Sequence, residues 1–294
     1  MTVRRKGVGP GSGECARSAV RHTGIGRALA MAAAAAVTLS ACAGPEEPAP
    51  VHAAFAVTLQ ELAVLIEPLP ESVQERILAE PAVFLDLMAK TLEQPHDLLM
   101  LVDKEHALAE DYRPADLVDL DGRGLTVTRP SMTLRAFVLP DLAAMTAAAR
   151  LAGTDVTVSS AYRSYARQDF LFDYNVERLG LEQASTLVAR PGHSQHQLGT
   201  AIDFGSIDLG YGETHEGQWV LANAWRFGFS LSYPQGLEDV TGYQYEPWHF
   251  RYVSRAGAEL ERRFFGIQQL FLSHYRHLMP ALQAAVAAGV TAGA

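Results

Sequence analysis

The two cysteines of this 294-residue chain constrain how its fold can be stabilised. Both lie near the N-terminus, at positions 15 and 42, and the rest of the chain has none. Residues 1–27 carry six basic residues and one acidic residue, and residues 28–39 are almost wholly apolar, which is the order of a secretory signal. If that signal is removed before Cys42, no disulfide can form within the remaining chain. Stability outside the cytoplasm then depends on packing or on a metal site.

The apolar run of the leader is too short for a permanent membrane span. Its twelve residues would form a helix of about 18 Å, whereas a hydrocarbon core is about 30 Å thick. The run ends in Leu39-Ser40-Ala41-Cys42, which resembles the lipobox of bacterial lipoproteins, where the cysteine is acylated after cleavage. The resemblance implies a signal peptide over 1–41, a lipid anchor on Cys42, and an extracytoplasmic, membrane-anchored lipoprotein. An ordinary secretory signal with an incidental cysteine is the alternative.

Composition favours one folded domain with appendages and argues against nucleic acid as a partner. Hydrophobic residues make up 48% of the chain and charged residues 19%, close to the averages for soluble globular proteins. The formal net charge is −9, and it becomes −14 without residues 1–41, because six bases and one acid leave with the leader. Nucleic-acid binding needs clustered Lys and Arg, so this acidic chain is not expected to bind it.

Proline and helical periodicity divide the part of the chain that follows the leader. Residues 42–53 are proline-rich and are predicted to be a tether. Leu59, Leu62, Ala63 and Ile66 recur at the spacing of one helix face, and two further helices are predicted over 71–79 and 81–93. Residues 54–97 are therefore predicted to form a helical cap or spacer.

The central region mixes short apolar runs with helical patterns but lacks regular βαβ alternation. Strands are predicted over 98–102, 156–159, 200–204, 227–233 and 245–253, and helices over 134–151, 164–179 and 255–290. Alternation along 248–252 predicts aromatic rings on one strand face and His249 with Arg251 on the other. The pattern indicates an α+β fold, with a catalytic domain over 98–256 and a C-terminal helical extension over 257–294.

Two polar segments about fifty residues apart carry the candidate chemistry. Imidazole and carboxylate are the ligands that zinc takes outside thiolate sites, and hydrolytic zinc keeps one of four positions open. His196, Asp203 and His249 could supply three such ligands. Glu246 precedes His249 by three residues, close enough to place a free carboxylate beside the metal as a general base. From spacing alone, hydrogen bonding at the surface explains such residues about equally well.

The wider pattern is more specific than these four residues. It comprises Ser194-x-His196-x-x-Gly199-x-Ala201-x-Asp203 and Glu246-x-Trp248-His249, with further matches at 101–104, 112–114, 159–164 and 241–253. Over roughly 98–256 the chain thus resembles the zinc D-alanyl-D-alanine carboxypeptidases of the VanY type, relatives of the VanX dipeptidases. The resemblance implies a LAS-type zinc peptidase fold, shared by hedgehog domains and D,D-peptidases, with a small antiparallel sheet flanked by helices.

The resemblance also implies roles for the motif residues. His196, Asp203 and His249 match the zinc ligands of the family. Glu246 matches the base that deprotonates the attacking water and later protonates the leaving amine. Arg163 matches an arginine that stabilises the oxyanion or holds the carboxylate of the peptide. The implied chemistry is metal-assisted amide hydrolysis, with Zn²⁺ as the cofactor.

Three more residues are predicted to bind substrate, each with a simpler alternative. Ser194 matches a serine that contacts substrate in the family. Gln168 lies where relatives carry a glutamine, but a position on the helix surface explains it as well. Tyr162 is also explained by packing that shapes the pocket. Asp103 and Ser232 depart from the residues common in relatives, Asn and Arg, which leaves the substrate open rather than the hydrolysis.

The expected function is that of a lipid-anchored zinc carboxypeptidase, which removes the terminal D-alanine from peptidoglycan stem peptides. The expected partners are that stem peptide and, through Cys42, the membrane. Three alternatives within the same fold are an L,D-carboxypeptidase acting on tetrapeptide stems, a D,D-dipeptidase and an endopeptidase. A different class is a zinc-containing, non-catalytic module that binds the cell wall, although the presence of Glu246 beside three ligands speaks against it.

Overall fold

The structure is a computed structural model that describes residues 49–292. The predicted signal peptide, Cys42 and the first part of the predicted tether lie outside these residues. The described residues form one compact unit. Among the described residues, no helix combines the length and the apolar character that crossing a membrane requires.

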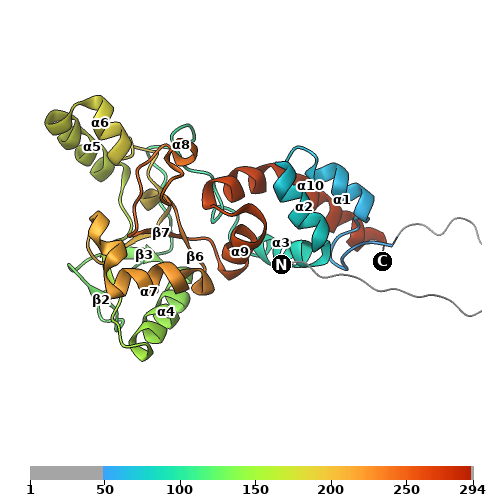
Figure 1. Cartoon of the computed structure of the whole chain (residues 1–294), viewed down its shortest axis with the longest axis horizontal. Coiled ribbons are helices and arrows are strands. Elements are labelled where there is room, and N and C mark those ends of the chain that lie inside the picture. The colour runs from blue at the N-terminus through green and yellow to red at the C-terminus, as the bar shows by residue number, and fades with distance from the viewer. Residues whose placement is uncertain (1–48, 293–294) are drawn as a thin grey trace, which may run out of the picture. The chain divides into compact units, whose positions relative to one another are not determined.

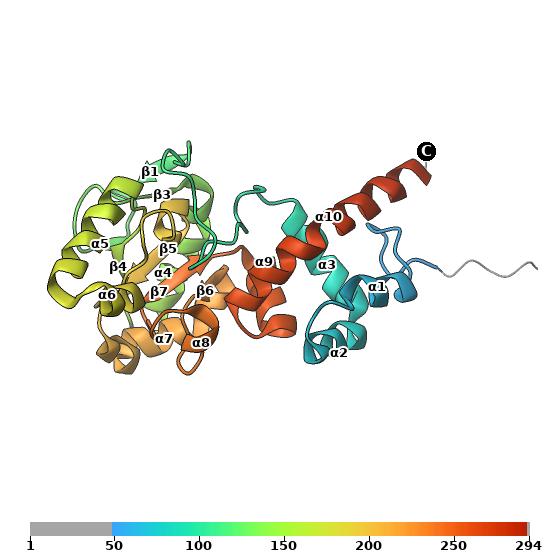
Figure 2. The same cartoon turned by 90° about the horizontal axis from the view of Figure 1, so that it is seen from above.

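A five-stranded sheet contains the end of the first polar motif, in β5, and His249 of the second, in β7 (Figures 1 and 2). The strand order is β2-β4-β5-β7-β6, and all neighbours are antiparallel except β2 and β4, which are parallel. These strands are β2 (Thr126–Val127), β4 (Thr157–Ser160), β5 (Ala201–Phe204), β6 (Phe229–Leu231) and β7 (His249–Tyr252). A separate antiparallel pair consists of β1 (Leu117–Asp119) and β3 (Thr133–Arg135). The predicted α+β class with a small, mostly antiparallel sheet is confirmed.

Helices at the two ends of the described chain pack against each other. The N-terminal ones are α1 (Leu59–Ile66), α2 (Glu71–Ala79) and α3 (Pro81–Leu92), as the periodicity predicts. The C-terminal ones are α9 (Arg255–Leu260), a π-helical turn (Glu261–Phe265) and α10 (Gln268–Ala292). The ring of Phe84 meets the edge of Phe264 at a centroid distance of 5.3 Å, and Arg76 Nε donates to the Phe264 carbonyl at 2.8 Å. The predicted cap and the predicted C-terminal extension are therefore in direct contact.

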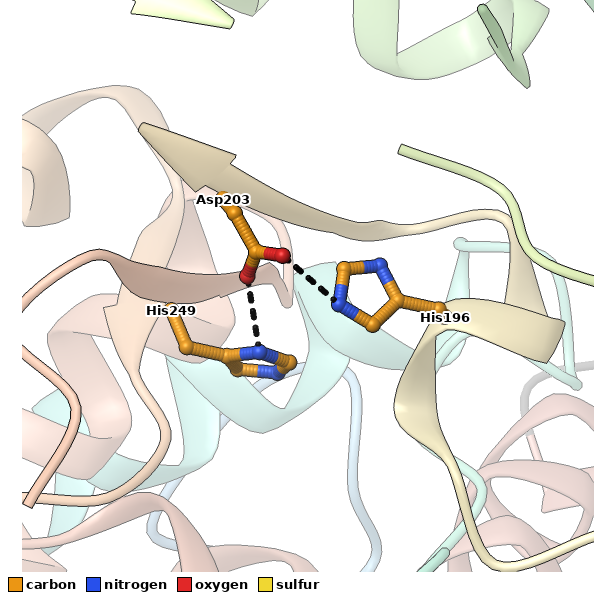
Figure 3. Close-up of side chains that lie close together, drawn as sticks. All are labelled: His196, Asp203 and His249. Carbon is orange, nitrogen blue, oxygen red and sulfur yellow. Dashed lines mark ion pairs between the residues drawn. The ribbon is translucent and has the colours of Figure 1, made fainter. Parts of the chain in front are cut away.

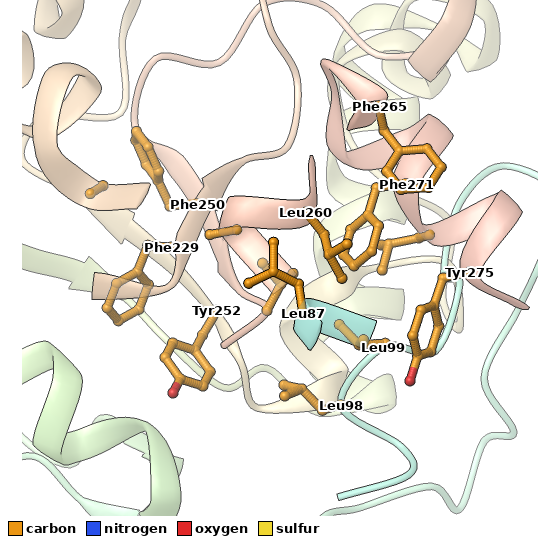
Figure 4. Close-up of a cluster of buried hydrophobic side chains, with 14 of the residues drawn as sticks. Leu87, Leu98, Leu99, Phe229, Phe250, Tyr252, Leu260, Phe265, Phe271 and Tyr275 are labelled. Atoms are coloured by element: carbon orange, nitrogen blue, oxygen red, sulfur yellow. The ribbon is translucent and has the colours of Figure 1, made fainter. Parts of the chain in front are cut away.

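One apolar core joins these helices to the sheet (Figure 4). Its members include Phe229, Phe250 and Tyr252 of the sheet, Leu87 of α3, Leu260 of α9, and Phe271 and Tyr275 of α10. Burying a large apolar side chain contributes roughly 1.5–3 kcal/mol, so a cluster of this size stabilises the cysteine-free part of the chain by packing alone. The predicted domain boundaries at 97/98 and 256/257 stay predictions, and the core runs across both.

The remaining helices flank the sheet and are α4 (Leu139–Leu151), α5 (Tyr165–Leu179), α6 (Leu181–Leu187), α7 (His215–Asn223) and α8 (Glu238–Thr241). The Ser164 hydroxyl accepts a hydrogen bond from the Arg167 N–H and caps α5, and Gly180 at φ +79° follows its last residue, Leu179, in agreement with the helix predicted over 164–179. The predicted helix over 134–151 begins only at Leu139, because the preceding residues form β3 and a 3₁₀ turn. Pro140 therefore lies in the first turn of α4, where its missing N–H costs no helical hydrogen bond.

The strand predicted over 98–102 is wrong. This segment is a turn followed by irregular backbone, although Leu98, Leu99 and Val102 are buried as the apolar run implies. The Leu98 and Met100 carbonyls accept hydrogen bonds from Arg251 Nη2 at 2.7 and 2.8 Å, instead of pairing with a neighbouring strand. An apolar run indicates that a segment is buried, but it does not indicate which groups its backbone bonds to. Here the buried guanidinium of Arg251 takes the place of a neighbouring strand as the hydrogen-bond donor.

Candidate active site

Three adjoining elements bring the predicted ligands together. His196 lies on the 3₁₀ turn η2 (Gln195–Leu198), Asp203 on β5, and His249 is the first residue of β7. The register of the β5–β7 pair sets Asp203 directly opposite His249. Gly199 ends η2 at φ +68°, and a Cβ there would lie 2.9 Å from a methyl group of Leu117. Glycine therefore suits the close turn that leads from His196 into β5.

The three ligand side chains form one buried cluster (Figure 3). His196 Nε2 lies 3.2 Å from Asp203 Oδ2, and His249 Nδ1 lies 3.0 Å from Asp203 Oδ1. All three residues offer a ligand atom within 4.8 Å of the others. Among the described residues, this is the only cluster of three or more His, Cys, Asp or Glu side chains close enough to share a metal ion.

Hydrogen bonds fix which nitrogen of each imidazole faces the cluster. His196 Nδ1 lies 2.7 Å from the Ala161 carbonyl, which can only accept, so Nδ1 carries the proton and Nε2 offers its lone pair. His249 Nε2 lies 3.3 Å from Gln195 Oε1, so its Nδ1 is free to face Asp203. Histidine ligands in metal sites are oriented in this way by acceptors on their far nitrogen.

The donor set fits a zinc ion. Two imidazoles and one carboxylate are a common three-ligand set for zinc with an open fourth position. Asp203 Oδ1 is buried and has no well-aligned hydrogen-bond donor, a deficit that a cation would remove. Burial lowers the pKa of His196 to about 4, which keeps that ring neutral, as a ligand must be.

Glu246 lies beside the cluster but outside the set of three. Its Oε2 is 3.5 Å from His249 Nδ1, and its backbone N–H donates to the Tyr233 carbonyl at 3.1 Å. Burial raises the pKa of Glu246 to about 7. A carboxyl group with such a pKa can both accept and return a proton near neutral pH.

Arg163 reaches the cluster from the segment between β4 and α5. Its Nη1 donates to Gln168 Oε1 at 2.9 Å and its Nη2 to Ser160 Oγ at 3.2 Å, and Nη2 lies 3.8 Å from Asp203 Oδ2. Burial lowers the pKa of Arg163, but a guanidinium remains charged in proteins. Because Gln168 and Ser160 hold the Arg163 guanidinium in place, it can bind an anionic group next to the cluster.

A cavity of about 280 Å³ opens over these groups. Its polar lining residues include Arg163, Ser194, Glu246 and the three predicted ligands, and its apolar ones are Leu171, Leu187, Val188, Ala189, Ile207 and Trp248. Such a lining suits a short peptide with small apolar side chains and a charged end.

Two residues predicted to bind substrate do not line this cavity. Gln168 is fully buried, and its amide accepts from Arg163 and donates to the Ala189 carbonyl at 2.6 Å. It therefore holds Arg163 in place and is not a helix-surface residue, the simpler alternative for it. Tyr162 is half-buried, and its N–H donates to the Thr133 carbonyl. Substrate contact by either side chain stays a prediction.

Three residues near the cluster were not predicted from the sequence. Tyr233 and Tyr243, whose ring centroids are 4.7 Å apart, line the cavity next to His249. The third is Gln195, which contacts the far nitrogen of His249. Tyr243 and Gln195 lie inside the quoted motif segments, and that proximity was the only signal available for them.

Comparison with known proteins agrees with this geometry. A family model described as VanY, D-alanyl-D-alanine carboxypeptidase, matches residues 131–255. The putative carboxypeptidase YodJ of Bacillus subtilis is 38% identical over 178 residues, which are 58% of this chain and 65% of that protein. The chain thus spans slightly less than two thirds of that relative. The bifunctional D-Ala-D-Ala dipeptidase and carboxypeptidase VanXYC of Enterococcus gallinarum is 31% identical, over 53% of this chain and 83% of that protein.

Solved structures give the same result for the fold. The LdcB LD-carboxypeptidase superposes with a TM-score of 0.53 at 34% identity, covering 59% of this chain and 84% of that one. A mutant of the D,D-pentapeptidase VanY in complex with Zn(II) superposes with a TM-score of 0.51 at 27% identity, covering 60% and 99%. The fold expected from the sequence motifs is confirmed by these two likenesses.

Proposed function

Because this chain belongs to the VanY family of D-alanyl-D-alanine carboxypeptidases and is a peptidase, we propose that it is a zinc-dependent carboxypeptidase that removes the terminal D-alanine from peptidoglycan stem peptides. The observation that carries the proposal is the buried His196, Asp203 and His249 cluster, with Glu246 and Arg163 beside it in one cavity. The Zn(II) complex of the VanY relative supports the choice of metal.

The residues of this chain divide the proposed reaction among themselves. His196 Nε2, His249 Nδ1 and the Asp203 carboxylate would hold the zinc ion. When bound, zinc polarises the scissile carbonyl and lowers the pKa of water towards about 7. Glu246 takes a proton from the attacking water as the new C–O bond forms. It then delivers that proton to the leaving amine as the C–N bond breaks, which yields a carboxylic acid and an amine.

Arg163 and the apolar lining residues position the peptide. The guanidinium fork of Arg163 either pairs with the terminal carboxylate or stabilises the charge that develops on the scissile carbonyl oxygen. Ser194 lines the same cavity and can donate a hydrogen bond to the peptide. The apolar side chains of the cavity exclude water around the methyl group of alanine.

A comparison of stem peptides tests the substrate. Purified protein is incubated with tetrapeptide and pentapeptide stems, and the products are identified by mass spectrometry. We expect loss of one alanine from the pentapeptide only, abolished by a chelator and restored by added zinc. Release of alanine from the tetrapeptide alone would replace the D,D assignment with an L,D one, and release of the D-Ala-D-Ala dipeptide would make the protein a dipeptidase.

The L,D alternative has a specific observation in its favour. The LdcB LD-carboxypeptidase is 34% identical to this chain, against 27% for the Zn(II)-bound VanY. LdcB and VanY share one fold, so the difference between L,D and D,D specificity must lie in the cavity walls and loops. The stem-peptide comparison decides between the two because each substrate carries only one of the two bonds at its end.

We also propose that the protein is anchored outside the cytoplasm by a lipid on Cys42. The basic segment, the twelve apolar residues and the Leu39-Ser40-Ala41-Cys42 sequence support this. In a bacterial host given radioactive palmitate, the wild type is expected in the membrane fraction with label, and Cys42→Ala without label. An unlabelled wild type would refute the anchor and leave the peptidase assignment intact.

A further inference from the structure

A chain of buried amide and hydroxyl groups leads from His249 to the C-terminal helix. Gln195 Oε1 lies 3.3 Å from His249 Nε2 and accepts from Ser232 Oγ at 2.7 Å. Gln195 Nε2 donates to Gln268 Oε1 at 3.0 Å. Gln268 Nε2 donates to the Ser230 carbonyl at 3.3 Å and to Ser230 Oγ at 3.1 Å. Gln195, Ser230, Ser232 and Gln268 are each at most 3% exposed, so bulk water does not reach these groups.

The direction of every hydrogen bond in this chain follows from its last member. The Ser230 carbonyl can only accept, so the Gln268 amide must turn its NH₂ group towards it and its oxygen towards Gln195. The Gln195 amide must then present its NH₂ group to Gln268 and its oxygen to His249. That oxygen requires a proton on His249 Nε2, which leaves the lone pair on Nδ1, the atom that faces Asp203.

Gln268 belongs to a part of the chain that the family model does not cover. It is the first residue of α10, whereas the family match ends at residue 255. We propose that Gln268 is a positioning residue for the metal site, which fixes the orientation of the Gln195 amide and thereby the metal-binding tautomer of His249. The C-terminal helix thus contributes to the metal site as well as to the core.

The proposal predicts what happens without the Gln268 amide. Once unanchored, the Gln195 amide can rotate and present its NH₂ group to His249 Nε2. That nitrogen must then accept, the proton moves to Nδ1, and Nδ1 can no longer bind a metal. Partners that orient metal-binding histidines in this way typically contribute about 10–100-fold to metal affinity.

Zinc affinity of matched variants provides the test. We expect Gln268→Met to raise the zinc dissociation constant by about 10-fold, measured by competition with a chromophoric chelator. The control is Gln269→Met on the same helix, because Gln269 donates to Asp103 Oδ2 at 2.6 Å and has no part in this chain of hydrogen bonds. Zinc binding by Gln269→Met should stay within twofold of the wild type.

A double variant separates positioning from packing. In Gln195→Glu/Gln268→Met, both oxygens of residue 195 accept, so neither orientation can donate to His249 Nε2. We expect this double variant to bind zinc as tightly as the single variant Gln195→Glu, whereas a merely structural role of Gln268 would weaken zinc binding in both backgrounds. Equal zinc affinity of Gln268→Met and Gln269→Met, or weaker zinc binding by the double variant than by Gln195→Glu, would overturn the proposal.

A second measurement does not depend on zinc. Nitrogen-15 spectra of the metal-free protein should show a larger fraction of His249 protonated at Nε2 in the wild type than in Gln268→Met. The inference rests on the metal site of the proposed function, and the two can fail separately. A wild type that binds no zinc refutes the proposed function, whereas an unchanged tautomer in a folded Gln268→Met refutes the positioning role alone.

Discussion

Replacing Glu246 with glutamine should lower kcat on the stem-peptide substrate by about 10³-fold while leaving the zinc content unchanged. The amide has nearly the shape of the carboxyl group but cannot take a proton from water. Glu246 also lies outside the set of three ligand side chains, so their donor atoms stay in place. Steady-state kinetics together with elemental analysis of the purified variant measures both quantities.

A matched control separates proton transfer from the loss of a buried carboxylate. Glu216 is a half-buried carboxyl that accepts from the Thr157 N–H at 2.9 Å and does not line the cavity, and burial raises its pKa as well. Glu216→Gln should keep kcat within about twofold of the wild type. If Glu246→Gln retained a tenth or more of the wild-type kcat, Glu246 would not be the base, and the reaction would need another proton acceptor.

The cluster of predicted ligands could be anticipated because each of its members lies in a short local sequence pattern. His196 and Asp203 lie in one short motif, residues 194–203. The period of two along 248–252 separates His249 from the aromatic rings that pack in the core. The starts of helices are also set by nearby residues. Ser164 caps α5 and Thr58 caps α1, and each side chain accepts a hydrogen bond from the backbone N–H three residues later.

Residues with distant partners could not be predicted in this way. Gln195 and Gln268 are 73 positions apart, and an amide without a charge or a periodic spacing gives no sign of burial. The error over 98–102 has the same origin, because the partner of that backbone is Arg251, about 150 positions later. Local sequence therefore pointed to the residues that cluster, while only the fold shows what holds them in place.

The largest effect on metal binding is expected from Asp203→Asn, which removes the only anionic ligand. We expect the zinc dissociation constant to rise by about 10³-fold or more, beyond the roughly 10–100-fold typical of residues that only orient ligands. Zinc at about 1,000 times the wild-type dissociation constant should stabilise the wild type by about 4 kcal/mol and this variant by less than about 0.5 kcal/mol. Urea unfolding with zinc and with a chelator measures both increments.

Asp97→Asn is the control, because it also removes a partly buried carboxylate that pairs with a cation. Asp97 Oδ2 lies 2.8 Å from Arg135 Nη1 and accepts from the Tyr112 hydroxyl at 3.0 Å. Its loss should lower the free energy of unfolding equally with zinc and with chelator, because Asp97 is not a member of the ligand cluster. A zinc increment that survives Asp203→Asn would mean that the histidines bind zinc without the carboxylate. The negative charge next to the zinc ion would then have to come from Glu246, which could no longer serve as a free base.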